Sequence, residues 1–428
     1  MTMMETVASK IRSIMSLPDL RKKIIFTLIM CVVARVGTHI PTPGVDIESL
    51  QRHVDGNDIL GFMNMFSGGA FSRISIFALG VMPYINASIV MQLLTVLVPA
   101  LEEIQKEGDS GRQKISQWTR YLTIAVAIIQ SIGIYVWLKQ SGLIVMENQT
   151  LFVVTLIPIL TAGTVFLMWL GEQITVNGIG NGISLLIFIN IVARLPIATL
   201  QSAQTMQGDK FFLVKAAVIA VAAVVVIGFV VLISLGKRRI PIIYVGKGFG
   251  GKGAVGAQQY IPLKVNTAGV MPIIFASVIM MLPSFLLKAV PNTWEGYKYL
   301  SRMFESTSPV YLALYAAMVI FFAFFYTALM FDPEKVADNL KKGGGSIPGV
   351  RPGEETVVYL EKVVTRITWG GAVFLAILAI MPMIIFGMMK MPVYFGGTGL
   401  LIVVGVALDL IQQINAHLVM RDYDGFIS

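Results

Sequence analysis

Uncharged apolar runs alternate with short charged segments along nearly the whole chain, and two neighbouring runs near the start stand out. Residues 61–72 form a glycine-interrupted apolar stretch that is too short to cross a bilayer, which needs about 20 apolar residues. The uncharged run 74–99 follows directly and is long enough. The pattern therefore predicts a half-helix beside a full transmembrane span.

The longer of these two runs carries a face of graded polarity. Its positions recur at spacings of four and three, which places them on one side of a helix: Val81, Ile85, Ser88, Gln92 and Thr95. A surface that faces lipid is expected to be apolar along its whole length, so it would not show such a gradient. A surface that lines a constriction and then opens into a wet vestibule would, so we expect this face to border a pathway.

The same pattern predicts ten membrane spans, of which the fifth is short. They cover residues 24–40, 74–99, 119–138, 151–172, 182–195, 212–235, 268–287, 309–331, 367–389 and 397–419. Hydrophobic residues make up 56% of the 428 and charged residues 13%, whereas a soluble domain carries about 25% charged residues. The mean hydropathy is +0.76. The chain is therefore expected to be an all-α polytopic membrane protein.

The basic residues give the orientation. Of the 33 Lys and Arg residues, 22 fall on the side that holds both termini and nine on the opposite side, when span ends are counted with their loops. Cytoplasmic loops carry the excess of positive charge. We therefore expect both termini, and the two long loops 236–267 and 332–366, to be cytoplasmic, and we see no cleavable signal pattern.

Ten spans divide into two halves of five, residues 1–211 and 212–428. Because each half has an odd number of spans, the second half must be inverted relative to the first. Such repeats are related by an axis in the membrane plane, with the pathway at their interface. The halves share no clear sequence identity, so the repeat is inferred from the number of spans alone.

The first long loop contains a glycine-rich basic segment, GKRRIPIIYVGKGFGGKGAVGAQQYIPLK, at 236–264. It partly fits nucleotide-binding loops, but Gly253 stands where a P-loop needs Ser or Thr, and no helix follows. We instead predict a hairpin with arms at 240–245 and 257–261. A solvated loop without a partner stays an alternative to a basic arm that docks on a cytoplasmic partner, such as ribosomal RNA phosphates.

The second long loop presents Arg351 between two Pro-Gly pairs, in the sequence PGVRPG, and a helical pattern resumes at Glu354. A flexible linker between two helices would not need a stiff turn that exposes one arginine. We therefore favour a partner contact here over a plain linker.

Ionisable residues are scarce within the spans. Asp409 is the one carboxylate well inside, with structural pairing or gating as its candidate roles, and Arg35 is expected to snorkel outwards or to face the bundle interior. This scarcity argues against the rival function, an ion-coupled secondary transporter with inverted repeats. The three histidines and Cys31 form no catalytic, metal-binding or disulfide pattern, so neither an enzyme, nor a cofactor, nor a metal is expected.

Six motifs resemble the bacterial SecY family, the large subunits of protein-conducting channels. They are IFALGVMPYI at 76–85, WLGEQI at 169–174, GIGNGIS at 178–184, KVNTAGV at 264–270, VRPGE at 350–354 and YFGGT at 394–398. The resemblance implies two inverted five-helix halves around an hourglass pore. It also implies a channel that passes unfolded polypeptides across the membrane and releases transmembrane segments sideways into lipid.

The resemblance further implies site residues, matched position by position. A ring of aliphatic side chains would close the pore: Val81, Ile85, Ile187, Ile191, Ile274 and Ile402. The half-helix 61–72 would be a movable plug, with Phe62, Met65, Phe66, Ser67, Gly68, Gly69 and Phe71. Gly68 and Gly69 would weaken that helix by roughly 1 kcal/mol each. A lateral gate between spans 2 and 3 and spans 7 and 8 would include Ser88, Gln92, Gln130 and Ser277.

The partners that the resemblance implies are the small subunits SecE and SecG, the SecA motor ATPase, the ribosome, signal sequences, nascent chains and membrane lipids. The cytoplasmic loops would dock the motor or the ribosome through Arg238, Arg239, Lys247, Lys252, Lys342 and Arg351. The expected location is the bacterial inner membrane.

Overall fold

The computed structural model describes residues 17–55, 58–205, 212–244, 259–289, 299–300, 303–305, 308–388 and 397–424. Within these ranges, ten helices coincide one for one with the ten predicted spans. They are α2 (Pro18–Gly37), α5 (Met82–Leu97), α7 (Asp109–Gln140), α8 (Gln149–Asn177), α9 (Gly182–Thr205), α10 (Phe212–Leu235), α11 (Met271–Ala289), α13 (Pro309–Met330), α15 (Glu354–Met388) and α16 (Gly397–Asp424).

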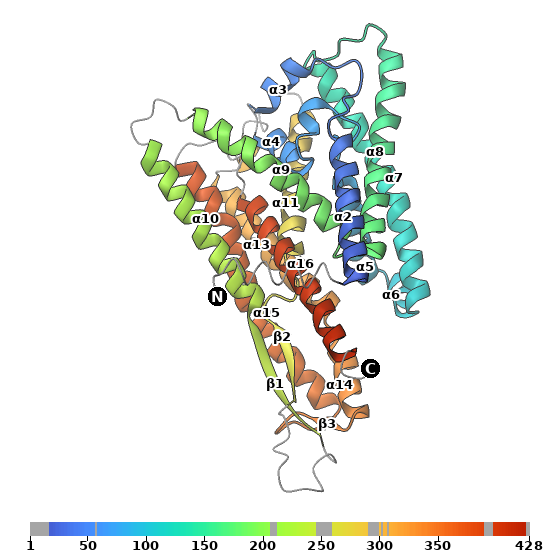
Figure 1. The fold of residues 1–428 in the computed structure, drawn as a ribbon, viewed down its shortest axis with the longest axis vertical. Helices are drawn as coiled ribbons and strands as arrows, with labels where there is room; N and C mark the ends of the chain where they lie inside the picture. The colour runs from blue at the N-terminus through green and yellow to red at the C-terminus, as the bar shows by residue number, and fades with distance from the viewer. Residues whose placement is uncertain are drawn as a thin grey trace.

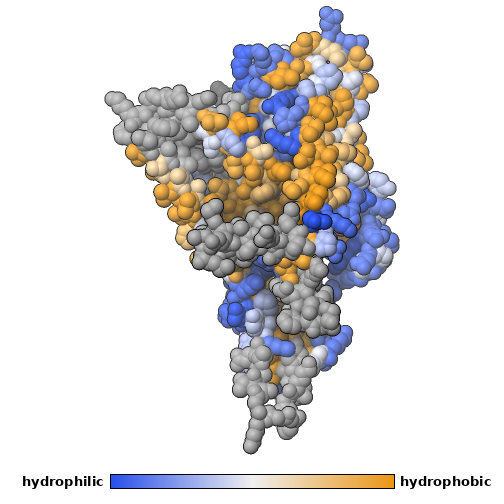
Figure 2. Space-filling view, in the orientation of Figure 1, coloured by the Kyte–Doolittle hydropathy of each residue, from blue (hydrophilic) through white to orange (hydrophobic). Residues whose placement is uncertain are grey.

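The helices form a broad body, and a small sheet extends from one end of it (Figure 1). Hydrophobic side chains cover the middle of the helical body, and hydrophilic ones gather above and below it (Figure 2). Five described helices are long and apolar enough to cross a membrane, and the bent pair α5–α6 (Pro99–Lys106) would make a sixth. Side chains such as Ile129 and Val224, both 68% exposed, fit a lipid environment rather than water.

The second span starts later than the sequence predicted. Residues 74–81 form turns rather than helix, and α5 begins at Met82 with Val81 as its N-cap. Two backbone features explain this: Gly80 has a positive φ of 59°, which ends any helix running into it, and Pro83 occupies the first turn, where its missing N–H costs nothing. At the other end Pro99 starts α6, which turns away from α5 by 99°.

The predicted half-helix 61–72 is also shifted. The helix there is α4 (Asp58–Phe66), which is followed by a tight turn and the short 3-10 helix η1 (Phe71–Arg73). Gly68 and Gly69 have φ angles of 68° and 89° and lie in the turn. The prediction that they weaken the helix from within is therefore wrong, because they lie beyond its last residue. Helix α3 (Ile47–Asp55) precedes α4 and packs against both α4 and η1.

The predicted hairpin is present with different bounds. Strands β1 (Lys237–Tyr244) and β2 (Gln259–Lys264) pair antiparallel, with Ile240 opposite Ile261. The predicted arms were too short at their membrane-proximal ends. A third strand, β3 (Gly345–Ser346), comes from the second long loop and pairs with the other edge of β1. The two long loops therefore form one structure, a sheet with the order β2-β1-β3.

Helix α15 connects this sheet to the helical body. Its first turns carry Leu360 and Val363, which pack with Ile240, Leu263 and Ile347 in a small core of their own. Helix α14 (Pro333–Lys342) packs against α15 and β3 and is capped by Asp332, whose side chain accepts a hydrogen bond from the Lys335 N–H at 3.2 Å. The bonds from Lys335 lower the pKa of Asp332. The described parts of both loops thus form an extension (Figure 1) on the side where basic residues are concentrated.

Candidate pore, plug and gate

The six predicted ring residues lie in one buried hydrophobic cluster, and each is at most 4% exposed. They come from four places in the fold: Val81 and Ile85 from the start of α5, Ile187 and Ile191 from α9, Ile274 from α11 and Ile402 from α16. The first four belong to the N-terminal half and the last two to the C-terminal half. Helices from both halves therefore contribute aliphatic side chains to one buried cluster.

The α4 segment packs against the cluster that holds the ring residues. Met65 and Phe66 belong to the same cluster as the ring residues, and α4 contacts α9 and α11. A Cβ atom built on Gly399 would lie 3.0 Å from the Met65 sulfur and 3.4 Å from Ile191 Cγ2, so the Met65 side chain ends beside a ring residue. Phe71 instead joins a second cluster and stacks on Trp137 at 5.9 Å. The side chain of Phe62 lies outside the described residues.

The turn that ends α4 is closed by its own hydrogen bonds. Asn64 is the centre of this network: its carbonyl accepts from the Gly69 N–H at 2.8 Å, and its side-chain oxygen accepts from the Ser72 N–H at 3.0 Å. The Ser67 hydroxyl accepts from the Phe71 N–H at 3.0 Å. The segment can therefore keep its shape as a unit if it moves.

Two side chains from distant helices donate to the same turn. Arg35 of α2 donates to the Gly68 carbonyl at 2.6 Å, and the amide of Asn190 of α9 donates to the Phe66 carbonyl at 3.1 Å. Arg35 thus faces the bundle interior, which was one of its two predicted placements. Neither contact was predicted. A lone asparagine in the apolar run 185–192 could have indicated a functional residue, because polar side chains are rare within membrane spans.

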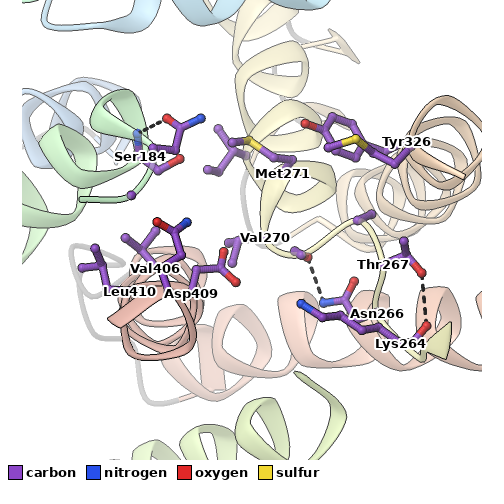
Figure 3. A pocket seen from close by; sticks show the side chains of 17 residues that line it. Ser184, Lys264, Asn266, Thr267, Val270, Met271, Tyr326, Val406, Asp409 and Leu410 are labelled. Carbon is purple, nitrogen blue, oxygen red and sulfur yellow. Dashed lines mark hydrogen bonds between the residues drawn. The ribbon is translucent and has the colours of Figure 1, made fainter. Parts of the chain in front are cut away.

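A cavity of about 220 Å³ lies on the sheet side of the ring. Ile274 forms part of its lining, together with polar residues of both halves, among them Ser184, Asn266 and Asp409 (Figure 3). The Asp409 side chain reaches into this space from α16, and in the part of the chain that the structure describes no ion pair involves it. A buried apolar cluster thus has beside it a cavity whose lining includes polar side chains.

The predicted gate residues are only partly brought together. Helix α5 packs against α7 on one side and contacts α11 on the other, so it lies at the seam between the halves. Gln92 donates to the Ser88 hydroxyl at 3.2 Å, and the buried oxygen of that amide has no partner in the described chain. Ser277 donates to its own helix at Ile274, and Gln130 is half-buried on α7. On the other side of the seam, Phe275 of α11 packs on Phe322 and Tyr326 of α13.

Three basic residues of the first loop, Lys237, Arg238 and Arg239, lie on strand β1. Arg238 and Arg239 are both exposed, and the Arg239 guanidinium lies 4.7 Å from the centre of the Tyr260 ring. Lys264 ends β2 and donates to Gln412 of α16 at 2.9 Å, which fixes the sheet to the helical body. The predicted contacts Lys247 and Lys252 lie outside the described residues.

Arg351, one of the predicted docking residues, has 87% of its side chain accessible. Its only ion pair in the described chain is a long one, 4.0 Å, with Glu355. Its backbone is held in place, because its N–H donates to Glu355 and its carbonyl accepts from the Thr356 hydroxyl at 2.8 Å. Beside it lies an open depression of about 740 Å³ that Ile243, Lys341 and Ile347 also line. Lys342 is paired with Asp338 at 3.8 Å on the neighbouring α14.

Comparison with known proteins adds three kinds of likeness. The family model described as SecY matches residues 75–411. The chain is 44% identical to the protein translocase subunit SecY of Streptomyces galbus over 96% of this chain and 97% of that protein, and 45% identical to that of Escherichia coli K12 over 96% and 95%.

Among solved structures, a protein-conducting channel matches with a TM-score of 0.66 at 18% identity, covering 92% of both chains. A SecY protein whose plug domain is described as stabilising the closed state and maintaining a membrane seal matches with 0.65 at 18%, again over 92% of both. Canine Sec61, in a ribosome–channel complex, matches with 0.63 at 17% over 92% of both. At these identities the likeness concerns the fold.

Proposed function

This chain belongs to the SecY family and is a multi-pass membrane protein of that fold, and we propose how it works as a protein-conducting channel. The observation that carries the mechanism is that six aliphatic side chains from both halves belong to one buried cluster. Met65 and Phe66 of the plug-like segment belong to the same cluster, and a cavity with polar residues in its lining lies beside it. The pathway runs through this cluster, and the ring closes it when no polypeptide is present.

An aliphatic ring suits a channel that must accept many sequences. It offers no fixed hydrogen-bond partner, so a polar polypeptide is not held, and it can close around side chains of different size. A dry constriction also resists ions, because dewetting makes their entry costly. The segment 58–73 adds a second seal that is displaced when a chain enters. The SecY protein with the described plug domain supports this assignment by analogy.

The seam between α5 and α7 on one side and α11 and α13 on the other is the lateral gate. A transmembrane segment inside the pore reaches lipid through it, and each CH₂ that becomes buried contributes about 0.8 kcal/mol. Apolar segments therefore leave sideways by their own free energy. The weakly satisfied pair Ser88–Gln92 suits an interface that opens, because it gives the closed state little polar stabilisation.

The sheet formed by both long loops is the docking site for cytoplasmic partners, the ribosome and the SecA motor. Arg238, Arg239 and Arg351 are exposed on it. The Sec61 likeness, which comes from a ribosome-bound complex, supports the first partner. SecE and SecG would cover part of the exposed apolar helix surface. The excess of basic residues on this side supports cytoplasmic termini and an inner-membrane location in bacteria.

The rival function, an ion-coupled transporter, needs carboxylates at the pathway. Asp409 is the one carboxylate that lines the described cavity. The named relatives are translocase subunits, not enzymes or small-molecule transporters. The energy for transport would thus come from the motor or from chain elongation.

The movement of the plug can be tested with one cysteine. Ser67 is 3% exposed, and cysteine is nearly isosteric with serine, so Ser67→Cys in a Cys31→Ala background gives a buried probe in the turn after α4. We expect slow modification by a soluble thiol reagent in the idle channel. We expect at least tenfold faster modification when a stalled translocation intermediate occupies it.

The matched control is Ser131→Cys on α7, since Ser131 is 0% exposed and lies outside the plug. Its modification rate should not depend on engagement. Equal rates at position 67 in idle and engaged channels would show that the plug is static.

A further inference from the structure

Two polar side chains hold the plug from outside it, and we propose that Arg35 and Asn190 form a latch that sets how readily the plug leaves the pore. The inference rests on the proposed role of α4 and the following turn as a movable plug. It names two positioning residues that none of the ring, plug or gate assignments includes. Both act on main-chain atoms of the plug, not on the translocating polypeptide.

The geometry places both donors at the end of α4. The last carbonyls of a helix have no partner within it. Here the Phe66 carbonyl accepts from the Asn190 amide at 3.1 Å, and the Gly68 carbonyl accepts from Arg35 at 2.6 Å. Both residues lie far from the plug in sequence, by 124 and 33 positions. The plug is thus fixed to α9 on one side and to α2 on the other.

The space around Gly68 shows how closely the two side chains approach. A Cβ atom on Gly68 would lie 2.7 Å from Arg35 Nη1 and 2.7 Å from Asn190 Oδ1. The two latch residues therefore meet over this glycine. Gly68 also has a positive φ of 68°, which side chains rarely adopt. There is room here for a glycine but not for a side chain. Arg35 and Asn190 therefore contact main-chain atoms of the plug, and these contacts must break when the plug moves.

Burial makes these hydrogen bonds important for the stability of the closed plug. Asn190 is 6% exposed, and the Phe66 side chain is 1% exposed in the ring cluster. Losing a buried hydrogen bond to a main-chain carbonyl is costly. Asn190 is neutral, so replacing it with another neutral residue removes the hydrogen bond without changing the charge around the plug.

Removing the Asn190 donor should raise the fraction of idle channels with a displaced plug. Asn190→Leu keeps the side-chain size and Asn190→Ala shortens it, and both lose the amide N–H without adding a charge beside Arg35. We expect each to increase thiol modification at Ser67→Cys in the idle channel about tenfold, the equivalent of about 1.4 kcal/mol, with a parallel rise in ion leak. The amount of assembled protein in the membrane should stay the same.

The control is Ser131→Ala, which removes a buried hydroxyl that donates within its own helix, to Ala127. It should leave idle modification unchanged. The latch is overturned if the engaged parent channel exposes position 67 but neither Asn190 variant raises idle modification. It is also overturned if Ser131→Ala raises idle modification as much as they do. If position 67 is not exposed even by an engaged chain, the plug assignment itself fails, which is a separate result.

Discussion

Replacing Ile85, Ile187 or Ile274 with asparagine is expected to open the idle channel to ions and to let polypeptides with defective signal sequences through. Each residue is buried in the central cluster, at 2% to 4% exposure. A buried amide without partners costs about 1–3 kcal/mol, and each 1.4 kcal/mol is a factor of ten. The closed state should lose this amount relative to a hydrated, open one. We expect about a tenfold to hundredfold rise in leak, measured as conductance of reconstituted bilayers.

Two control variants distinguish a specific effect on the ring from a general loss of protein structure. Ile85→Val keeps the position apolar and should leave the leak near the parent value. Ile129→Asn places the same amide on the outer face of α7, where the native side chain is 68% exposed. It should affect insertion yield but not conductance. Unchanged leak and unchanged signal stringency in all three ring variants would show that these residues do not form the seal.

Reversing the charge of Arg351 is expected to reduce motor-driven export at least tenfold, while membrane assembly stays intact. The side chain is 87% exposed and its pair with Glu355 is long, so the fold depends little on it. A partner that buries this arginine against an acidic group would lose about 2–5 kcal/mol on Arg351→Glu. Export of a secreted precursor into inverted membrane vesicles measures the effect.

Glu355→Gln is the informative control here. It removes the charge of the ion-pair partner but keeps a side-chain oxygen that can accept from the Arg351 N–H, so the arginine stays in place and export should remain near the parent level. Lys362→Glu, an exposed charge reversal on the same helix α15, controls for net charge. If Arg351→Glu exports normally, or if Lys362→Glu is as defective, Arg351 is not a docking contact.

The arrangement of spans could be read from the sequence because membrane-crossing helices are long apolar runs with charged ends. The ten predicted spans all coincide with helices. The start of α5 was missed because run length ignores backbone conformation: Gly80 and Pro83 delay the helix to Met82 inside a run that is apolar throughout. The end of α4 was missed for the same reason at Gly68.

Contacts between distant segments could not be predicted from the sequence. Nothing in Gly345–Ser346 has strand propensity, and β3 exists because β1 offers an unpaired edge. The bonds from Arg35 and Asn190 go to main-chain carbonyls, which carry no residue-specific signal. The names ring, plug and gate came from the family resemblance, whereas the graded face of α5 came from spacing and the partner contact at Arg351 from its Pro-Gly turn. The six ring residues share one buried cluster with Met65 and Phe66, whereas the gate residues share one direct contact, Ser88 with Gln92.

The central claim is that a polypeptide passes through the ring, and crosslinking tests it most directly. Cysteines are introduced singly as Ile85→Cys and Ile274→Cys in the Cys31→Ala background, with Val154→Cys on the outer face of α8 as control, since Val154 is 63% exposed. A stalled translocating chain with a photoreactive or thiol-reactive probe should crosslink at both positions 85 and 274 and not at 154. Crosslinks at position 154 with none at 85 or 274 would contradict a pathway through the ring.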